Sequence, residues 1–129
     1  MVYYSKTGNT KKIAEAVARG AGAKCLSVES ARGVKGELFF VGTPLRWLGP
    51  SKPILEFLRG RDWSGERVAL FCTYLSVGNK RALKVMREEV ENRGGKVVGE
   101  FSWRGRLTPE GERRAEEFGK RVARLAVRA

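Results

Sequence analysis

Several residue types that chemistry depends on are missing or rare in this sequence of 129 residues, which has no histidine, no glutamine, one aspartate and two cysteines. Without histidine there is no Ser-His-Asp triad, no Cys-His pair and no imidazole to bind zinc or haem. Two cysteines cannot form a four-cysteine zinc site or an ordinary iron–sulfur cluster, and they argue against a secreted disulfide scaffold. No apolar run reaches the length of a membrane span, and the N-terminus lacks signal-peptide features. We therefore expect a cytoplasmic protein without a membrane span.

Positive charge is in large excess, with 26 Lys and Arg against 14 Asp and Glu and a net charge of +12. Such an excess suggests an anionic partner, which can be a phosphate, a nucleic acid or an acidic protein. The alternative is that most of this charge forms a solvated, ion-paired surface. Abundant Arg and Glu, with little Asn or Asp, is a thermophile-like composition.

Short apolar runs alternate with helical patterns, which predicts an α/β fold, and the length fits a single domain over residues 1–129. Residues 29–36 are too few for a full crossover helix, so we expect a loop or one turn there. We expect Ser51 and Thr108 to cap helices, and Leu125 to face inward on the last one. The periodicity predicts strands at 2–4, 24–28, 37–41, 67–73 and 96–103, and helices at 11–20, about 53–60, 79–93 and from 109 onward. This pattern predicts a doubly wound sheet that binds its ligand at the carboxyl ends of the strands.

A hydroxyl-rich turn, Ser5-Lys6-Thr7-Gly8-Asn9-Thr10, lies between the first predicted strand and the first helix. Such a turn directs backbone N–H groups, hydroxyls and the positive end of the helix dipole at one point, where a phosphate would fit. The pattern is neither a Walker motif nor the dinucleotide pattern GxGxxG. The alternative is a simple helix start capped by Thr10.

The pattern [ST]-x-T-G-x-T, matched at Ser5, Thr7, Gly8 and Thr10, resembles the phosphate loop of the flavodoxin family. Two further landmarks follow in the expected order, Gly42-Thr43-Pro44 after the third strand and Phe71-Cys72-Thr73-Tyr74 at the end of the fourth. The resemblance extends over essentially the whole chain. It implies a flavodoxin-like, five-stranded parallel sheet in the order 2-1-3-4-5, here with a reduced or missing second crossover helix, and FMN bound non-covalently.

The resemblance also implies which segments would surround FMN. Residues 5–10 would hold the phosphate, 43–49 would border the ribityl chain and the inner ring face, and 73–78 the outer edge. Trp47 and Tyr74 are the candidate stacking rings, unless they are an ordinary loop tryptophan and a core tyrosine. Arg46 holds the position at which the family pattern has its aromatic residue, and Gly49 would be the glycine beside the flavin N5. The complete expected cofactor-binding set is Ser5, Lys6, Thr7, Gly8, Asn9, Thr10, Thr43, Pro44, Arg46, Trp47, Gly49, Thr73, Tyr74, Leu75 and Gly78, with no catalytic residue and no metal ligand assigned.

The function implied by the resemblance is that of a one-electron carrier whose FMN cycles between oxidised, semiquinone and hydroquinone forms. One alternative is a small FMN-dependent oxidoreductase acting on a quinone or porphyrinogen, although the chain offers no histidine as a proton donor. Another is a flavin-free module that binds an acidic protein or nucleic acid, for which an intact hydroxyl set would be unnecessary. Familiar flavodoxins are acidic whereas this chain is basic, so we expect it to bind an acidic redox-partner protein rather than nucleic acid. We also expect a monomer.

Two smaller features complete the expectations from sequence. The segment Trp103-Arg104-Gly105-Arg106 follows the fifth strand on the edge of the flavin site, where it is a candidate docking surface or a solvated loop with a buried tryptophan. Cys25 and Cys72 would lie three sheet positions apart, roughly 14 Å, which is beyond disulfide reach. We therefore expect both thiols to be reduced and Cys72 to be an inert core residue.

Overall fold

The structure is a computed structural model that describes residues 2–3, 9–31, 38–46, 49–75 and 77–128. Of these, residues 2, 9, 46 and 126–128 are described by their backbone alone.

Five parallel strands form the sheet in the order β2-β1-β3-β5-β6. The short strand β4 pairs antiparallel with the end of β3 and lies off this path. With β4 set aside, the order matches the predicted 2-1-3-4-5, so the flavodoxin-like architecture is confirmed. The strands are β1 (Val2–Tyr3), β2 (Leu26–Ser27), β3 (Leu38–Arg46), β4 (Gly49–Pro50), β5 (Arg67–Tyr74) and β6 (Lys96–Arg104).

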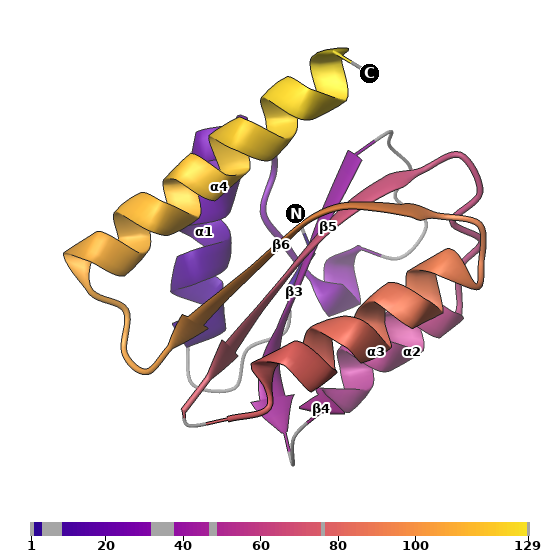
Figure 1. Ribbon diagram of the computed structural model, residues 1–129, viewed down its shortest axis with the longest axis horizontal. Coiled ribbons are helices and arrows are strands. Elements are labelled where there is room, and N and C mark those ends of the chain that lie inside the picture. Colours follow the sequence, from indigo (N-terminus) through magenta and orange to yellow (C-terminus); the bar gives the residue numbers. More distant parts are fainter. Residues whose placement is uncertain (1, 4–8, 32–37, 47–48, 76, 129) are drawn as a thin grey trace.

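In the part of the chain that the structure describes, two helices cover each face of the sheet (Figure 1). Helices α1 (Asn9–Ala21) and α4 (Pro109–Arg128) lie side by side on one face, and α2 (Lys52–Arg59) and α3 (Asn79–Glu91) lie on the other. A single 3₁₀ turn, Val28–Ser30, follows β2. It agrees with the expected short connection, whose remaining residues 32–37 lie outside the described part of the chain.

The strict alternation of side chains along β3 and β5 explains why these strands read as continuous apolar runs. Phe39 and Val41 of β3 pack toward α2 and α3, whereas Phe40 between them packs toward α1 and α4. In β5, Leu70 and Phe71 divide in the same way between the two faces. Because both faces are covered by helices, every residue of these runs can be apolar.

Helices α1 and α4 pack so closely that glycine is required on both. A Cβ atom on Gly20 would collide with the backbone of Glu116, and one on Gly119 would collide with the carbonyl of Val17. Two helices whose backbones touch in this way cannot shift relative to each other without losing contact. The helix that begins at the predicted phosphate turn is therefore fixed by the last helix of the chain.

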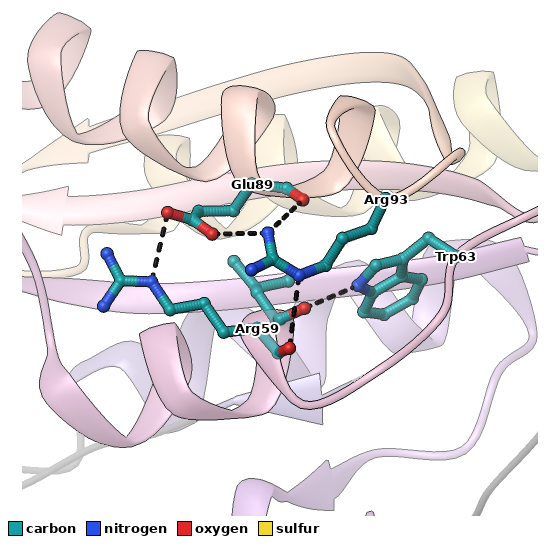
Figure 2. Close-up of polar contacts among 5 residues, drawn as sticks. Arg59, Trp63, Glu89 and Arg93 are labelled. Carbon is teal, nitrogen blue, oxygen red and sulfur yellow. Dashed lines mark hydrogen bonds and ion pairs between the residues drawn. The ribbon is translucent and has the colours of Figure 1, made fainter.

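Arg93, which follows α3, links α3 to the C-terminal end of α2 (Figure 2). Nε of Arg93 donates to the carbonyl of Arg59 at 3.2 Å, and its Nη1 donates to the carboxylate of Glu89 at 2.7 Å. Arg59 bonds the same carboxylate at 3.1 Å, and the indole of the fully buried Trp63 donates to the carbonyl of Leu58 at 3.0 Å. The carbonyls at the end of α2 thus find donors that the helix itself cannot provide.

The structure corrects four details of the sequence reading. Strand β3 continues to Arg46 instead of ending at Val41. Pairing with β5 extends to Pro44, and the fixed φ angle of a proline is compatible with an extended strand. Strand β2 is shorter than predicted, with only residues 26–27. Ser51 stands at the N-cap position of α2 but makes no side-chain cap bond, since its hydroxyl is bonded elsewhere. Leu125 is 50% exposed rather than inward-facing.

Candidate functional site

The candidate site lies at the edge of the sheet where β3, β5 and β6 end and α1, α2 and α3 begin (Figure 1). In a doubly wound sheet ligands bind outside the carboxyl ends of the strands, at the point where the strand order reverses, which here lies between β1 and β3.

Two of the predicted site residues from distant parts of the chain meet in a buried hydroxyl pair. Oγ1 of Thr10, in the first turn of α1, lies 2.9 Å from Oγ1 of Thr73, near the end of β5. Thr10 is 1% exposed and Thr73 is 7% exposed. Thr73 reaches α1 because it follows Phe71 by two residues on the strand, and Phe71 faces α1 and α4. Either hydroxyl can donate, so the direction of this bond is free to respond to a ligand.

Thr43 belongs to a different hydroxyl pair on the opposite face of the sheet. It is fully buried, and its Oγ1 accepts the backbone N–H of Ser51 at 2.9 Å and lies 3.0 Å from the Ser51 hydroxyl. Parity again explains the direction, since Thr43 follows Val41, which packs toward α2 and α3. The Thr43 hydroxyl therefore attaches the start of α2 to β3. Pro44, next along the strand, lies opposite Thr73 in the sheet register.

The outer loop of the predicted site runs from the end of β5 to α3 and is held by the segment after β6. The carbonyl of Tyr74 accepts the N–H of Gly105 at 2.7 Å, and the carbonyl of Leu75 accepts Nε of Arg104 at 3.2 Å. Gly78 precedes α3 with φ of 102°, a left-handed conformation that glycine adopts without strain. The side chain of Tyr74 is half-buried and that of Leu75 is 81% exposed.

The charge of this edge is mostly positive. The segments between strand and helix, with residues from the first turns of α1, α2 and α3, contain three cations in residues 4–12, two in 43–53, three in 73–84 and two in 103–109. No acid lies within these ranges, but Glu110 and Glu112 follow in the first turn of α4. The first turns of α1, α2 and α3 carry no acidic residue, although acids are the favoured residues there. An anion at this edge would be attracted both by the side chains and by the helix dipoles.

Part of the predicted set cannot be compared with the structure. Ser5, Lys6, Thr7, Gly8 and Trp47 lie outside the described residues. Asn9 begins α1, and Arg46 ends β3 where it pairs with Gly49 of β4, but the side chains of Asn9 and Arg46 are not described. The phosphate-loop and inner stacking assignments therefore remain predictions.

The two cysteines are free, as expected. Cys72 is fully buried beside the outer loop, and desolvation, aided by the charge of Glu100, raises the pKa of its thiol to about 12. Burial also raises the pKa of the half-buried Cys25. A thiol with a raised pKa holds its proton at neutral pH and is a poor nucleophile.

Some structural features of this edge had only a weak signal in the sequence. The pairing of Thr10 with Thr73 depends on which face of β5 Thr73 occupies, and alternation from Phe71 would have indicated that face. The role of Arg104 and Gly105 in holding the outer loop depends on the register Tyr74↔Arg104. That register is set by an irregularity between Val68 and Ala69 that no local pattern reveals.

Comparison with known proteins gives a fold-level relationship. No family model matches the sequence, and no curated protein matches it. Among solved structures, a flavodoxin from the domain Archaea is similar over 98% of this chain and 96% of its own, with 22% identity and a TM-score of 0.84. Oxidised flavodoxin 1 from Bacillus cereus is similar over 96% and 95%, with 17% identity and a TM-score of 0.81. Rubredoxin oxygen:oxidoreductase from Desulfovibrio gigas is similar over 98% of this chain but 35% of its own, with 16% identity and a TM-score of 0.82.

These similarities show that the chain has the flavodoxin-like fold. None of the helices described in the structure combines the length and apolar character needed to cross a bilayer.

Proposed function

We propose that this protein binds one FMN at the carboxyl edge of its sheet and serves as a one-electron carrier. The observation that carries the proposal is the Thr10–Thr73 pair, which brings hydroxyls to the first turn of α1, at an edge where the first turns of α1, α2 and α3 carry no acid. Hydroxyls, a helix N-terminus and cations are the donors that a phosphate group needs, so the donor chemistry of the described residues fits FMN. The fold gives further support, because the solved structures similar to this chain include flavodoxins.

Within this proposal, residues 5–10 hold the phosphate, 43–49 border the ribityl chain and inner ring face, and 73–78 border the outer ring edge. Trp47 and Tyr74 would stack on the isoalloxazine, where aromatic contact and burial add affinity. The bound flavin would supply the redox chemistry, and the chain would supply binding, orientation and the electrostatic environment. We further propose a monomeric, single-domain, cytoplasmic carrier that exchanges electrons with an acidic redox-partner protein.

The decisive experiment is titration of the flavin-free protein with FMN and with riboflavin, with binding measured by the quenching of flavin fluorescence. We expect one FMN per chain and much weaker binding of riboflavin, because the phosphate contributes charge-assisted hydrogen bonds of roughly 1.5–3 kcal/mol each. Equal affinity for the two flavins would remove the phosphate assignment. Absence of binding by either would refute the carrier function.

The matched variants are Thr10→Val and Ser64→Ala. Thr10→Val removes a hydroxyl from the site, and we expect it to reduce the preference for FMN over riboflavin. Ser64→Ala removes an exposed hydroxyl whose bond is to Asp62, outside the edge segments, and we expect it to leave the preference unchanged.

A further inference from the structure

We infer that the protein docks an electron-transfer partner through a surface on the β5–α3 and β6–α4 segments, with an apolar centre and a cationic rim. This inference rests on the proposed function and specifies where the acidic partner binds. We call the surface the docking edge, and its residues are Leu75, Val77, Lys80, Arg81, Arg104 and Arg106.

The apolar centre of the docking edge is unusual for this molecule. Leu75 is 81% exposed and Val77 is 65% exposed, and among the described large hydrophobic residues only Leu125, on α4, is also exposed. Both aliphatic side chains lie on one loop, and exposed aliphatic residues are of the kind found at the centre of a transient protein interface.

The loop that carries these side chains is held in place rather than projecting freely. Arg104 and Gly105 donate to the carbonyls of Leu75 and Tyr74, and the amide of Asn79 donates to Ser102 of β6 at 3.1 Å. A surface that is already ordered loses little conformational entropy when a partner binds. These bonds also place the two chain segments of the docking edge beside each other.

The rim of the docking edge is positive and its charges are available. Lys80, Arg81, Arg104 and Arg106 are all exposed, and none of the four forms an ion pair with another described residue. Several arginines elsewhere are paired, as Arg19 is with Glu112 and Arg87 with Glu100, whereas the exposed arginines at 113, 121 and 124 on α4 form no ion pair with a described residue. Cations left without partners around an apolar centre are complementary to a protein surface whose apolar patch is ringed by carboxylates.

Nucleic acid fits the same surface less well. Single-stranded nucleic acids are held by cations together with exposed aromatic rings on which bases stack. None of the exposed large hydrophobic residues in the described part of the chain is aromatic, and the indole of Trp103 is half-buried with its N–H bonded to the carbonyl of Arg106. The docking edge therefore favours an acidic protein.

The test is an NMR titration of the ¹⁵N-labelled protein, flavin-free and FMN-loaded, with the zinc form of rubredoxin as an acidic electron-transfer protein. We expect amide shifts on 74–81 and 104–106, and an affinity that falls roughly tenfold between about 20 and 200 mM salt. Shifts centred elsewhere, or binding insensitive to salt, would overturn the inference. Tighter binding of a short oligothymidine than of rubredoxin would do the same, in favour of nucleic acid.

Matched variants separate a local docking surface from general charge. Lys80→Glu with Arg106→Glu should weaken rubredoxin binding about tenfold or more, whereas Lys24→Glu with Lys96→Glu, at the opposite edge, makes the same change in net charge and should weaken it less than threefold. Equal effects of the two pairs would show that net charge alone is responsible and would contradict the docking edge.

The apolar centre is tested in the same way. Val77→Ser should weaken binding several-fold, and Leu125→Ser, an exposed aliphatic residue far along α4, should not. Because the titration is also made without flavin, a chain that takes up no FMN refutes the proposed function while the docking inference is still decided.

Discussion

Replacing Thr73 by valine tests whether the buried hydroxyl pair serves the ligand or only the fold. In the proposed site Thr10 contacts the phosphate, whose oxygens accept hydrogen bonds, so Thr10 would donate its single hydroxyl hydrogen to it. In that state the Thr10 oxygen must accept from Thr73, which lies 2.9 Å away. Valine keeps the shape of Thr73 but removes this donor, so Thr10 keeps its hydrogen for the phosphate and loses the bond that orients it.

The expected size follows from the burial of the pair. A neutral hydrogen bond contributes roughly 0.5–1.5 kcal/mol, and a buried group left without its partner costs about 1–3 kcal/mol. Since Thr10 is 1% exposed, water cannot readily replace Thr73. We expect a loss of roughly 1–2 kcal/mol in FMN binding, which is about a 5- to 30-fold weaker affinity. Riboflavin has no phosphate, so its affinity should change less than about twofold.

The assay is fluorescence titration of the wild type and variants with both flavins, with the free energy of unfolding measured in urea alongside. Thr73→Ser keeps the hydroxyl and should retain most of the preference for FMN. Thr43→Val breaks the other buried hydroxyl pair, and should lower stability without changing the ratio of FMN to riboflavin affinity. If Thr73→Val weakened both flavins by the same factor, the pair would be structural and the reasoning would be refuted.

Three further predictions concern packing and titration. Gly119→Ala places a methyl group against the backbone of α1 and should lower the free energy of unfolding by roughly 1–3 kcal/mol, measured in urea, whereas Lys120→Ala should change it by less than about 0.5 kcal/mol. Arg93→Met removes the donor to the last carbonyl of α2 and should lower the melting temperature by several degrees in calorimetry. An unchanged melting temperature would contradict this role of Arg93. With a thiol pKa of about 12, Cys72 should stay protonated and resist iodoacetamide in the folded protein up to about pH 10, while Cys25 reacts; equal labelling of both would show that Cys72 is not buried. Because folding raises this pKa, the folded protein favours the neutral Cys72 thiol. The contribution of the thiol to the free energy of unfolding is therefore fully present below about pH 9 and is lost as the pH rises toward 12.

The architecture could be predicted well from the sequence because the strands at the centre of the sheet have a clear local pattern of apolar residues. The runs around Phe40 and Leu70 are apolar at successive positions, which two covered faces require, and the helices between them have clear periodicity. The end of β3 was misread because Gly42 and Pro44 signal a loop locally, whereas pairing with β5 carries the strand through them. Tertiary pairing outweighed local preference there.

The candidate site was less predictable because its contacts join residues far apart in the chain. The separation between Thr10 and Thr73 is 63 residues, and only the face and register of β5 decide that they meet. Thr43 and Ser51 were both singled out, but their bond to each other depends on Thr43 facing α2. Local motifs identify which residues can bind a ligand, and the sheet decides which of them meet.

The contact between Gly20 of α1 and the backbone of Glu116 in α4 also has a consequence for the order in which the protein can form. The helix that opens with the predicted phosphate turn leaves the ribosome about a hundred residues before the helix that covers it. Until then the nascent chain exposes the apolar face of α1, and its burial relies on a contact of very long sequence separation, which is slow to form. Ligand uptake should accordingly begin only after α4 has been released, and a ribosome-bound chain halted before residue 109 should bind no flavin.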